Sequence, residues 1–217
     1  MKSKRLIVYG IGKFAEYVSY VFNNDSEFEV SGFCIEKNIF KETSHAGLPV
    51  TIFEDLHLND DQFLFIAVGQ NHIRKRIFDV AKSKGFRMAT YLSSKAIFWP
   101  DLKIGQNSFI TEGTAIQPFV SIGDNSIHFG SRIGHHTTVG DHTLLSNATL
   151  GGNVKIGNET YLGMNSAVKQ NVSVAQRNII GMNVTIEENT LEDSVYSHKG
   201  SQKRSLSYND IAFRFLK

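Results

Sequence analysis

An α/β domain followed by a parallel β-helix is the fold class that this sequence predicts, and two patterns predict it. Aliphatic residues recur every six positions between Leu102 and Thr190, whereas residues 1–95 alternate short apolar runs with segments of helical spacing. A helix would need a period near about 3.6 residues and a single strand a period of about 2. A sustained period of six is instead the signature of a hexapeptide β-helix, in which three hexapeptides form one triangular coil.

The composition is that of a globular protein of one or two domains. In 217 residues, Lys+Arg 23 against Asp+Glu 21 gives a formal net charge of +2, so no strong field attracts nucleic acid. Cys34 is the only cysteine, which excludes an internal disulfide and suits a reducing compartment. No apolar run reaches membrane-spanning length and the N-terminus lacks the apolar core of a signal peptide. We therefore expect a cytoplasmic protein that binds neither membranes nor nucleic acid.

Residues 1–95 predict a small Rossmann-like domain with a parallel sheet. A buried strand over 5–9 precedes the glycine loop Gly10-Ile-Gly12-Lys13-Phe-Ala15, and helical spacing follows over 14–22. Strand, G-x-G-x-x-A and helix is the context that the dinucleotide-binding fingerprint requires. Further strands are expected over 28–34 and 62–68, with a turn at 47–50 and a helix from residue 72 onward.

Candidate ligand-binding residues follow the carboxyl ends of these expected strands. Glycine allows backbone N–H groups to approach a phosphate at a helix N-terminus, and an acidic residue after the second strand can bind a ribose hydroxyl. The candidates are Gly10, Gly12, Lys13, Glu36, Gly69, Asn71 and Arg74. The glycine loop could equally be a tight turn that binds nothing, and Arg74 a solvated surface charge. Because the domain is short, a mononucleotide-sized ligand is favoured over NAD.

Residues 96–190 predict the β-helix. Its inward positions should stack from coil to coil, and the small residue that often follows each should let the backbone turn the corner. These positions are Ile104, Ile110, Ile116, Ile122, Ile133, Val139, Leu145, Leu150, Ile156, Leu162, Val168, Val174, Ile180 and Ile186. The period breaks between Ile122 and Ile133 and again between Leu145 and Leu150. Phe98 and Trp99 are expected to cap the first coil, and residues 191–217 to form a polar tail that is either partly disordered or helical on a neighbouring subunit.

Four histidines lie between Ile122 and Leu145, namely His128, His135, His136 and His142. A hexapeptide coil does not need histidine, so their grouping beside the first break in the period indicates chemistry. Trimeric β-helix carbonic anhydrases bind zinc through three histidines, but such ligands converge from different coils. These four lie within about one coil of each other, so we predict no metal.

Several motifs resemble the left-handed β-helix acyltransferases of the sialic-acid O-acetyltransferase and bacillosamine N-acetyltransferase type. They are Gly10-Ile-Gly12-Lys13, Gly32-Phe33, Ala67-Val-Gly-Gln-Asn71 with Arg74, and Ile133–Asp141 followed by Ala148–Val154. The resemblance covers nearly the whole chain to about residue 192. It implies a homotrimer that binds acetyl-CoA between neighbouring coils and a nucleotide-linked sugar in the N-terminal domain.

The same resemblance implies roles for individual residues. His135 takes the place of the catalytic base, and the backbone N–H of Gly152 that of the donor to the thioester carbonyl. Residues expected to contact the coenzyme are Gly152, Gly163, Ser166, Ala167 and Gly181. In the family, a glutamate precedes the catalytic histidine and an aspartate follows it. This chain departs from that pattern, because it has Gly134 before His135 and His136 after it. Asp141 or a backbone carbonyl is then expected to orient the imidazole.

The resemblance therefore implies an acetyl-CoA-dependent N-acetyltransferase that acts on the amino group of a UDP- or dTDP-linked amino-deoxysugar. His135 suits direct attack by the amine, because the unperturbed pKa of imidazole lies near the working pH. Cys34 lies in the wrong domain to be a nucleophile. A sugar O-acetyltransferase of the sialic-acid type and a non-catalytic, nucleotide-sugar-binding β-helix protein are the alternatives.

Overall fold

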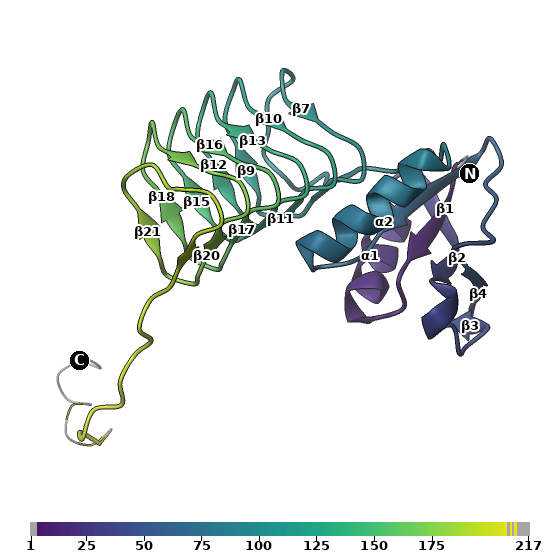
Figure 1. Cartoon of the computed structure of the whole chain (residues 1–217), viewed down its shortest axis with the longest axis horizontal. Coiled ribbons are helices and arrows are strands. Elements are labelled where there is room, and N and C mark those ends of the chain that lie inside the picture. Colours follow the sequence, from purple (N-terminus) through teal and green to yellow (C-terminus); the bar gives the residue numbers. More distant parts are fainter. Residues whose placement is uncertain (1–3, 208, 210, 212–217) are drawn as a thin grey trace.

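The computed structural model describes residues 4–207, 209 and 211, and these form two packed parts (Figure 1). An α/β domain lies at one end of a triangular parallel β-helix, and residues 197–207, after the last strand, extend away from the β-helix. Both parts of the predicted fold class are confirmed. No helix in the described part of the chain combines the length and apolarity that crossing a bilayer requires.

The α/β domain contains one sheet with the strand order β3-β4-β2-β1-β5. All neighbours are parallel except β3 and β4, which form a hairpin. The strands are β1 (Lys4–Tyr9), β2 (Phe28–Ile35), β3 (Ser44–His45), β4 (Leu48–Ile52) and β5 (Gln62–Ile66). The predicted turn at 47–50 is wrong: the chain turns at Ala46 and Gly47, both with positive φ, and Pro49 already lies in β4.

Two helices cover opposite faces of this sheet. Helix α1 (Lys13–Asn24) packs on the side of Leu6 and Val8, and α2 (Asn71–Ser83) on the side of Ile7 and Tyr9. Alternate residues of β1 thus point to the two helices, as the two-residue period of a strand requires. A short 3-10 helix, η1 (Lys37–Ile39), follows β2.

The β-helix consists of three parallel sheets. The first sheet holds β7 (Lys103–Ile104), β10 (Ser121–Ile122), β13 (Thr138–Val139), β16 (Lys155–Ile156) and β19 (Ser173–Val174). The second holds β6 (Tyr91–Leu92), β8 (Phe109–Ile110), β11 (Ile127–Phe129), β14 (Leu144–Ser146), β17 (Tyr161–Leu162), β20 (Ile179–Ile180) and β22 (Val195–Tyr196). The third holds β9 (Ala115–Ile116), β12 (Arg132–Ile133), β15 (Thr149–Leu150), β18 (Ala167–Val168) and β21 (Thr185–Ile186).

The chain passes from the first sheet to the second at what we term the first corner, from the second to the third at the second corner, and back at the third corner. Pairing in the second sheet begins at Tyr91 and ends at Tyr196. The regular β-helix therefore starts before the predicted boundary at residue 95 and ends after the predicted one at residue 190.

The predicted inward residues form one continuous core, with Ile104 partly buried at its end. The position predicted for the first break in the six-residue period is wrong. In β11, His128 pairs with Ile110 on one side and Leu145 on the other, so His128 occupies an inward position. The six-residue period continues from Ile122 to His128, and only the step from His128 to Ile133 is short. The aliphatic pattern in the sequence does not include His128, because histidine is not an aliphatic residue.

The corners are formed differently from the prediction. Positive φ occurs three residues after most inward positions, for example at Asn125, His136 and Asn153, and not at the small residue directly after them. Asparagine tolerates this left-handed conformation better than most residues. The glycines serve close approach between coils instead: a Cβ at Gly134 would lie 2.5 Å from the carbonyl carbon of Gly151.

The α/β domain shares a core with the first coils of the β-helix. The ring of Phe109 stacks on Tyr91 at 4.9 Å between centroids and meets Phe14 of α1 edge-on at 5.7 Å. Asp25, just after α1, accepts hydrogen bonds from the Ser93 hydroxyl and the Ser94 N–H at 2.9 and 3.0 Å. The α/β domain thus packs directly against the β-helix through both apolar and polar contacts.

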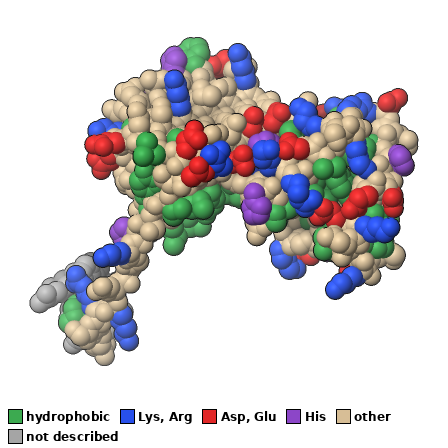
Figure 2. Space-filling model, in the orientation of Figure 1, with side chains coloured by type: hydrophobic (Ala, Val, Ile, Leu, Met, Phe, Trp, Pro, Cys, Tyr) green, Lys and Arg blue, Asp and Glu red, His purple; other side chains and the backbone are tan. Residues whose placement is uncertain are grey.

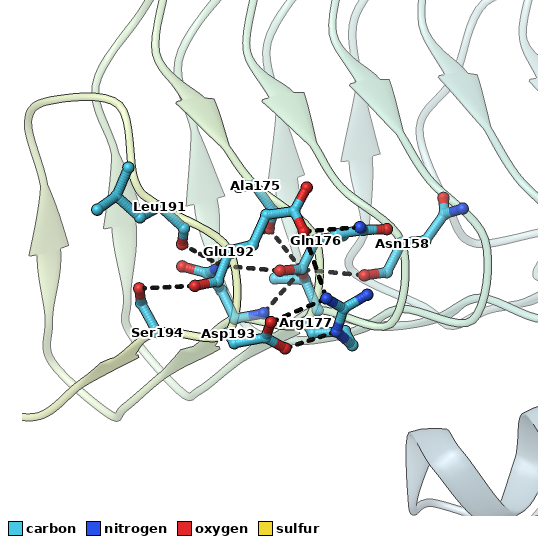
Figure 3. Close-up of polar contacts among 10 residues, drawn as sticks. Asn158, Ala175, Gln176, Arg177, Leu191, Glu192, Asp193 and Ser194 are labelled. Atoms are coloured by element: carbon cyan, nitrogen blue, oxygen red, sulfur yellow. Dashed lines mark hydrogen bonds and ion pairs between the residues drawn. The ribbon is translucent and has the colours of Figure 1, made fainter.

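The two ends of the β-helix are closed differently. The prediction that Phe98 and Trp99 cap the first coil is wrong, since they remain 42% and 55% exposed. At the other end, Arg177 forms ion pairs with Asp193 and Glu192, which fasten the last coil (Figure 3). The C-terminal tail was predicted to be partly disordered or to form a helix on a neighbouring subunit. In its apolar end, residues 211–215, only Ile211 is described by the structure, so the predicted helix lies outside the described residues.

Candidate active site

His135 and Gly152 lie on consecutive coils at the third corner. The strands that precede them, β12 and β15, are adjacent in the third sheet, with Arg132 opposite Thr149. A Cβ added at Gly152 would lie 2.7 Å from both Cε1 and Nε2 of His135, so only glycine leaves room for the imidazole. The structure thus brings together the two residues predicted to carry the chemistry.

His136 is the side-chain neighbour of the His135 imidazole. The two Nδ1 atoms are 3.1 Å apart, and the ring of His136 packs on Phe119 with 4.6 Å between centroids. If the Nδ1–H of His135 donates to His136, the Nε2 of His135 keeps its lone pair and can accept a proton. The expectation that Asp141 orients the imidazole is wrong, because Asp141 lies at the first corner and accepts from the N–H of Asp124.

The backbone N–H of Gly152 is available for a ligand. The neighbouring Gly151 N–H donates to the Val168 carbonyl at 2.9 Å, and the Gly152 carbonyl accepts from the N–H of Asn171 at 3.0 Å. Within the described part of the chain, the Gly152 N–H itself donates to no acceptor. An unpaired donor beside an exposed imidazole is the arrangement that stabilises a developing oxyanion.

The other residues predicted to bind the coenzyme lie elsewhere in the chain's own fold. Gly163, Ser166 and Gly181 lie at the second corner, and Ala167 begins β18 directly after it. The third sheet separates them from His135 and Gly152, so a single chain does not bring the two groups together. Ser166 and Ala167 border a cavity of about 510 Å³, which is also lined by Gly113, Gly130, Arg132, Asn147, Thr149 and Asn165.

A cavity in the α/β domain opens at the carboxyl edge of the sheet, and we term it the nucleotide cavity because residues predicted to bind a nucleotide line it. It measures about 590 Å³, and its lining includes the predicted residues Gly10, Gly12, Glu36 and Gly69. Gly10 has a φ of +114°, which a side chain would strain, whereas a Cβ at Gly12 would meet nothing within 4 Å. Lys13 is not part of this lining, because its 93% exposed side chain turns outward to pair with Glu16.

Glu36 is already engaged within the nucleotide cavity. Its carboxylate forms two hydrogen bonds with Arg76, at 2.6 and 2.9 Å, and these lower the pKa of Glu36. Burial, with the charge of Glu36, raises the pKa of the adjacent Tyr9 hydroxyl. A ribose hydroxyl at this carboxylate would therefore share it with Arg76. Sequence reasoning missed Arg76, since it faces the cavity only through the fold of α2.

A second cavity, which we term the interdomain cavity, lies between the N-terminus of α2 and the second sheet of the β-helix. It measures about 470 Å³ and is lined by Gly69, Gln70, Asn71, His72, Leu144, Glu159, Tyr161, Arg177 and Ile179. The Asn71 amide donates to the carbonyls of Glu159 and Thr160 at 3.3 and 3.1 Å. Gly69 and Gln70 line both cavities, so one loop separates them.

Arg74 is not a ligand-binding residue, contrary to the prediction. Its side chain is fully buried, and its guanidinium donates hydrogen bonds of 2.8–3.1 Å to five acceptors within the chain. A guanidinium has five N–H donors, so none is left for a substrate. The alternative, a solvated surface charge, is excluded as well.

Of the four histidines that group in the sequence, His135 and His136 stay together, whereas His128 and His142 lie elsewhere. His128 is enclosed in the β-helix core, where burial and the charge of Arg74 lower its pKa to about 3. His142 lies under α2, with its ring against Phe78 and its Nδ1 2.8 Å from the amide nitrogen of Asn125. Among the residues that the structure describes, no group of three His, Cys, Asp or Glu could hold a metal ion.

Comparison with known proteins agrees with this geometry. Residues 5–81 match the family model described as the PglD N-terminal domain. No curated protein sequence matches the chain significantly. The sequence match therefore lies in the α/β domain, and the rest of the chain resembles known proteins in its fold.

Solved structures share the whole two-domain architecture. The acetyltransferase domain of PglB from Neisseria gonorrhoeae FA1090 superposes with a TM-score of 0.78 at 21% identity, covering 88% of this chain and 95% of that one. A mutant of perosamine N-acetyltransferase from Caulobacter crescentus, in complex with CoA and GDP-perosamine, gives 0.75 at 20% identity, covering 88% and 90%. WeeI from Acinetobacter baumannii AYE gives 0.64 at 18% identity, covering 84% and 94%. Residues 5–81 therefore match the PglD N-terminal domain, and the chain as a whole has the two-domain fold of these solved structures.

Proposed function

We propose that the chain is an acetyl-CoA-dependent N-acetyltransferase that acts on the amino group of a UDP- or dTDP-linked amino-deoxysugar. The observation that carries this proposal is the contact between the exposed His135 imidazole and Gly152 on the next coil. It is supported by the similar folds of the PglB acetyltransferase domain solved with acetyl coenzyme A and of perosamine N-acetyltransferase solved with CoA and GDP-perosamine.

In the proposed reaction, the sugar amine attacks the thioester carbonyl of acetyl-CoA directly. Nε2 of His135 accepts the proton that the amine loses, while His136 holds the Nδ1–H and thereby selects the tautomer. The Gly152 N–H donates to the carbonyl oxygen as it gains negative charge. The carbon–sulfur bond then breaks, CoA departs as the thiolate, and the acetyl group remains on the sugar nitrogen as an amide.

The nucleotide would occupy the nucleotide cavity. Its diphosphate would lie against the backbone of Gly10, Gly12 and Gly69, where helix N-termini favour negative charge. The sugar would project past the loop of Gly69 and Gln70. The cavity's volume suits one nucleotide better than a dinucleotide, in line with the short domain.

A homotrimer would complete the coenzyme site. His135 and Gly152 lie at the third corner, whereas Gly163, Ser166, Ala167 and Gly181 lie at or beside the second. Packing of the third corner of one copy against the second corner of its neighbour would bring both groups to one molecule of acetyl-CoA. Exposed apolar residues on the last coils, including Ile179, Met182, Leu191 and Val195, are consistent with further buried surface (Figure 2).

One assay separates this function from its alternatives. The purified protein is incubated with acetyl-CoA and UDP-, dTDP- and GDP-linked sugars, each with an amino or a hydroxyl group at the same carbon, and released thiol is measured. Turnover restricted to the amino sugars supports the proposal, and turnover of hydroxyl sugars alone identifies an O-acetyltransferase. Binding of a nucleotide sugar without thiol release identifies a non-catalytic binding protein. A cytoplasmic location, which we also propose, fits the buried free thiol of Cys34.

A further inference from the structure

The Arg74 guanidinium is a buried positive charge without an acidic partner. Its acceptors are the carbonyl oxygens of Val68, Gly69, Asn125 and Thr143 and the side-chain oxygen of Asn71. Within the described part of the chain, no carboxylate forms an ion pair with Arg74. Burial lowers the pKa of Arg74 to about 9, so the group stays charged at neutral pH. Burying a charge is costly unless its hydrogen bonds are all satisfied, and here they are.

These hydrogen bonds converge on the segment that separates the two cavities. Nη1 of Arg74 donates to both the Val68 and Gly69 carbonyls, at 2.9 Å each, and Nη2 to the Asn71 side chain, also at 2.9 Å. This segment connects β5 to α2, and the residue that caps α2, Gln70, makes no side-chain capping hydrogen bond. Arg74 cannot cap the N–H groups of α2, because a guanidinium only donates, but it fixes the segment through the segment's oxygen atoms.

The same guanidinium fastens this segment to the β-helix. Nε donates to the Asn125 carbonyl at 3.1 Å and Nη2 to the Thr143 carbonyl at 2.8 Å, and both acceptors belong to the first corner. Val68 and Gly69 line the nucleotide cavity, and Gly69 and Asn71 line the interdomain cavity. One side chain thus sets the position of a shared cavity wall relative to the β-helix that carries His135.

We propose that Arg74 is a positioning residue, which holds the 68–71 segment against the β-helix so that a nucleotide sugar bound there is aligned for reaction. This role rests on the proposed acetyltransferase function. Lysine at this position would keep the charge but offer three donors in place of five. At least two of the five acceptors of Arg74 would then lose their donor, and the bound nucleotide would lose a preorganised wall.

The chain offers a matched control for a purely structural role. Asn107 is also fully buried, and it also bridges the two domains: it accepts from the N–H of Ile66 at 2.8 Å and donates to the side chain of Asn125 at 2.7 Å. It contacts β5 before the 68–71 segment and lines neither cavity. Asn107→Ala should weaken the domain contact without moving the cavity wall.

The test compares Arg74→Lys with Asn107→Ala in the full-length protein, with Arg74→Gln as a second variant that carries no charge to bury. We measure thermal stability, the KM for each substrate, and amide hydrogen exchange over residues 68–74. For Arg74→Lys we expect the nucleotide-sugar KM to rise by about tenfold, with the acetyl-CoA KM changed by less than about twofold. Exchange should accelerate within the segment. Asn107→Ala should lower stability and leave both KM values unchanged.

The outcomes of this test distinguish the positioning role of Arg74 from the proposed acetyltransferase function on which it rests. Arg74 variants that lose stability but keep the nucleotide-sugar KM, or that fail to fold where Asn107→Ala folds, overturn the positioning role. If the wild-type protein turns over no nucleotide sugar, the proposed function fails. Amide hydrogen exchange over residues 68–74 then decides whether Arg74 holds this segment in place. Faster exchange restricted to the segment then supports the role, and unchanged exchange there refutes it.

Discussion

At the scale of single residues, His135 and His136 form a pair that would, in the proposed reaction, take the place of an imidazole–carboxylate pair. A neutral histidine partner can accept the Nδ1–H of His135, but it adds no negative charge beside the imidazolium that forms during proton transfer. Gly134 brings no side chain to this corner, so the partner comes from the residue after His135.

We expect His135→Ala to lower kcat by about 10²–10⁴-fold with little change in either KM, because a general base acts in the transition state. His136→Ala should cost about tenfold or less, since it removes only the group that orients the base. His136→Asp should retain most of the activity, because a carboxylate can accept the same Nδ1–H. Steady-state kinetics checks all three. Full activity in His135→Ala together with an inactive His136→Ala would assign the base to His136.

His128 is a second residue with a specific energetic consequence. Its imidazole stands among aliphatic side chains, and neither nitrogen has a hydrogen-bond partner among the described residues. Burial lowers its pKa to about 3, against about 6.5 in an unfolded chain. Between these values the unfolded state binds more protons, so this group's contribution to stability falls as the pH drops below about 6.5.

His128→Leu should therefore stabilise the protein and reduce its acid sensitivity. Removing an unpaired buried polar group is worth about 1–3 kcal/mol, and leucine matches the neighbouring inward residue Leu145. Denaturant midpoints at pH 7 and pH 5 measure this, and the gap between variant and wild type should widen at pH 5. The exposed His57 supplies the control, His57→Leu. Equal gaps at both pH values would show that His128 does not titrate on unfolding.

At the scale of elements, the loop between β1 and α1 combines two glycines with different constraints. Gly10 has positive φ, and an added Cβ would lie 3.2 Å from the Ala67 carbonyl oxygen, so substitution there strains the backbone. Gly12 has an ordinary φ of −88° and open space around it, within the lining of the nucleotide cavity. Only Gly12 can be changed without disturbing the fold.

Gly12→Val should consequently leave the melting temperature within a few degrees of wild type and raise the nucleotide-sugar KM by about tenfold or more. The valine methyl groups would occupy the space through which a diphosphate approaches the backbone. The KM for acetyl-CoA should not change. Calorimetry and kinetics together test this, and a variant that binds acetyl-CoA less tightly while binding the sugar normally contradicts the proposed division between the domains.

At the scale of the whole molecule, the two domains behave as one unit because their cores are joined. Phe109 and Ile127, on the outer face of the second sheet, are fully buried against the α/β domain. Lys82 on α2 adds an ion pair of 3.6 Å with Asp124 at the first corner. Acidic and basic side chains are interspersed over the surface in view, in keeping with the small net charge (Figure 2).

A homotrimer is the expected assembly, because the proposed acetyl-CoA site combines residues from both the second and third corners. Sedimentation equilibrium at micromolar concentration should give three times the chain mass of 24.3 kDa. Mixing His135→Ala with a variant blocked at the second corner, Gly163→Trp, should restore part of the activity, since some interfaces then combine two intact corners. A monomer with full activity would disprove both the trimer and the shared site.

The sequence alone was sufficient for the architecture, and its resemblance to the acyltransferases singled out His135 and Gly152, which the fold places in contact. A β-helix repeats the same local geometry in each coil, so the six-residue period and the strand–glycine–helix order state the fold directly. In the same way, Gly10, Gly12, Glu36 and Gly69 follow strand ends that a parallel sheet must bring to one edge.

Only the tertiary structure decided the roles of residues that face the domain boundary. Arg74 reads as a surface or ligand-binding charge until α2 is placed on the first corner, because its acceptor Thr143 lies 69 residues away. His128 reads as a break in the period until its strand is placed between Ile110 and Leu145. The sequence suggests that the Glu36 carboxylate has no ion-pair partner, but the fold brings Arg76 beside it. Local periodicity determines where the backbone goes, whereas hydrogen bonds between distant segments depend on how the finished elements pack.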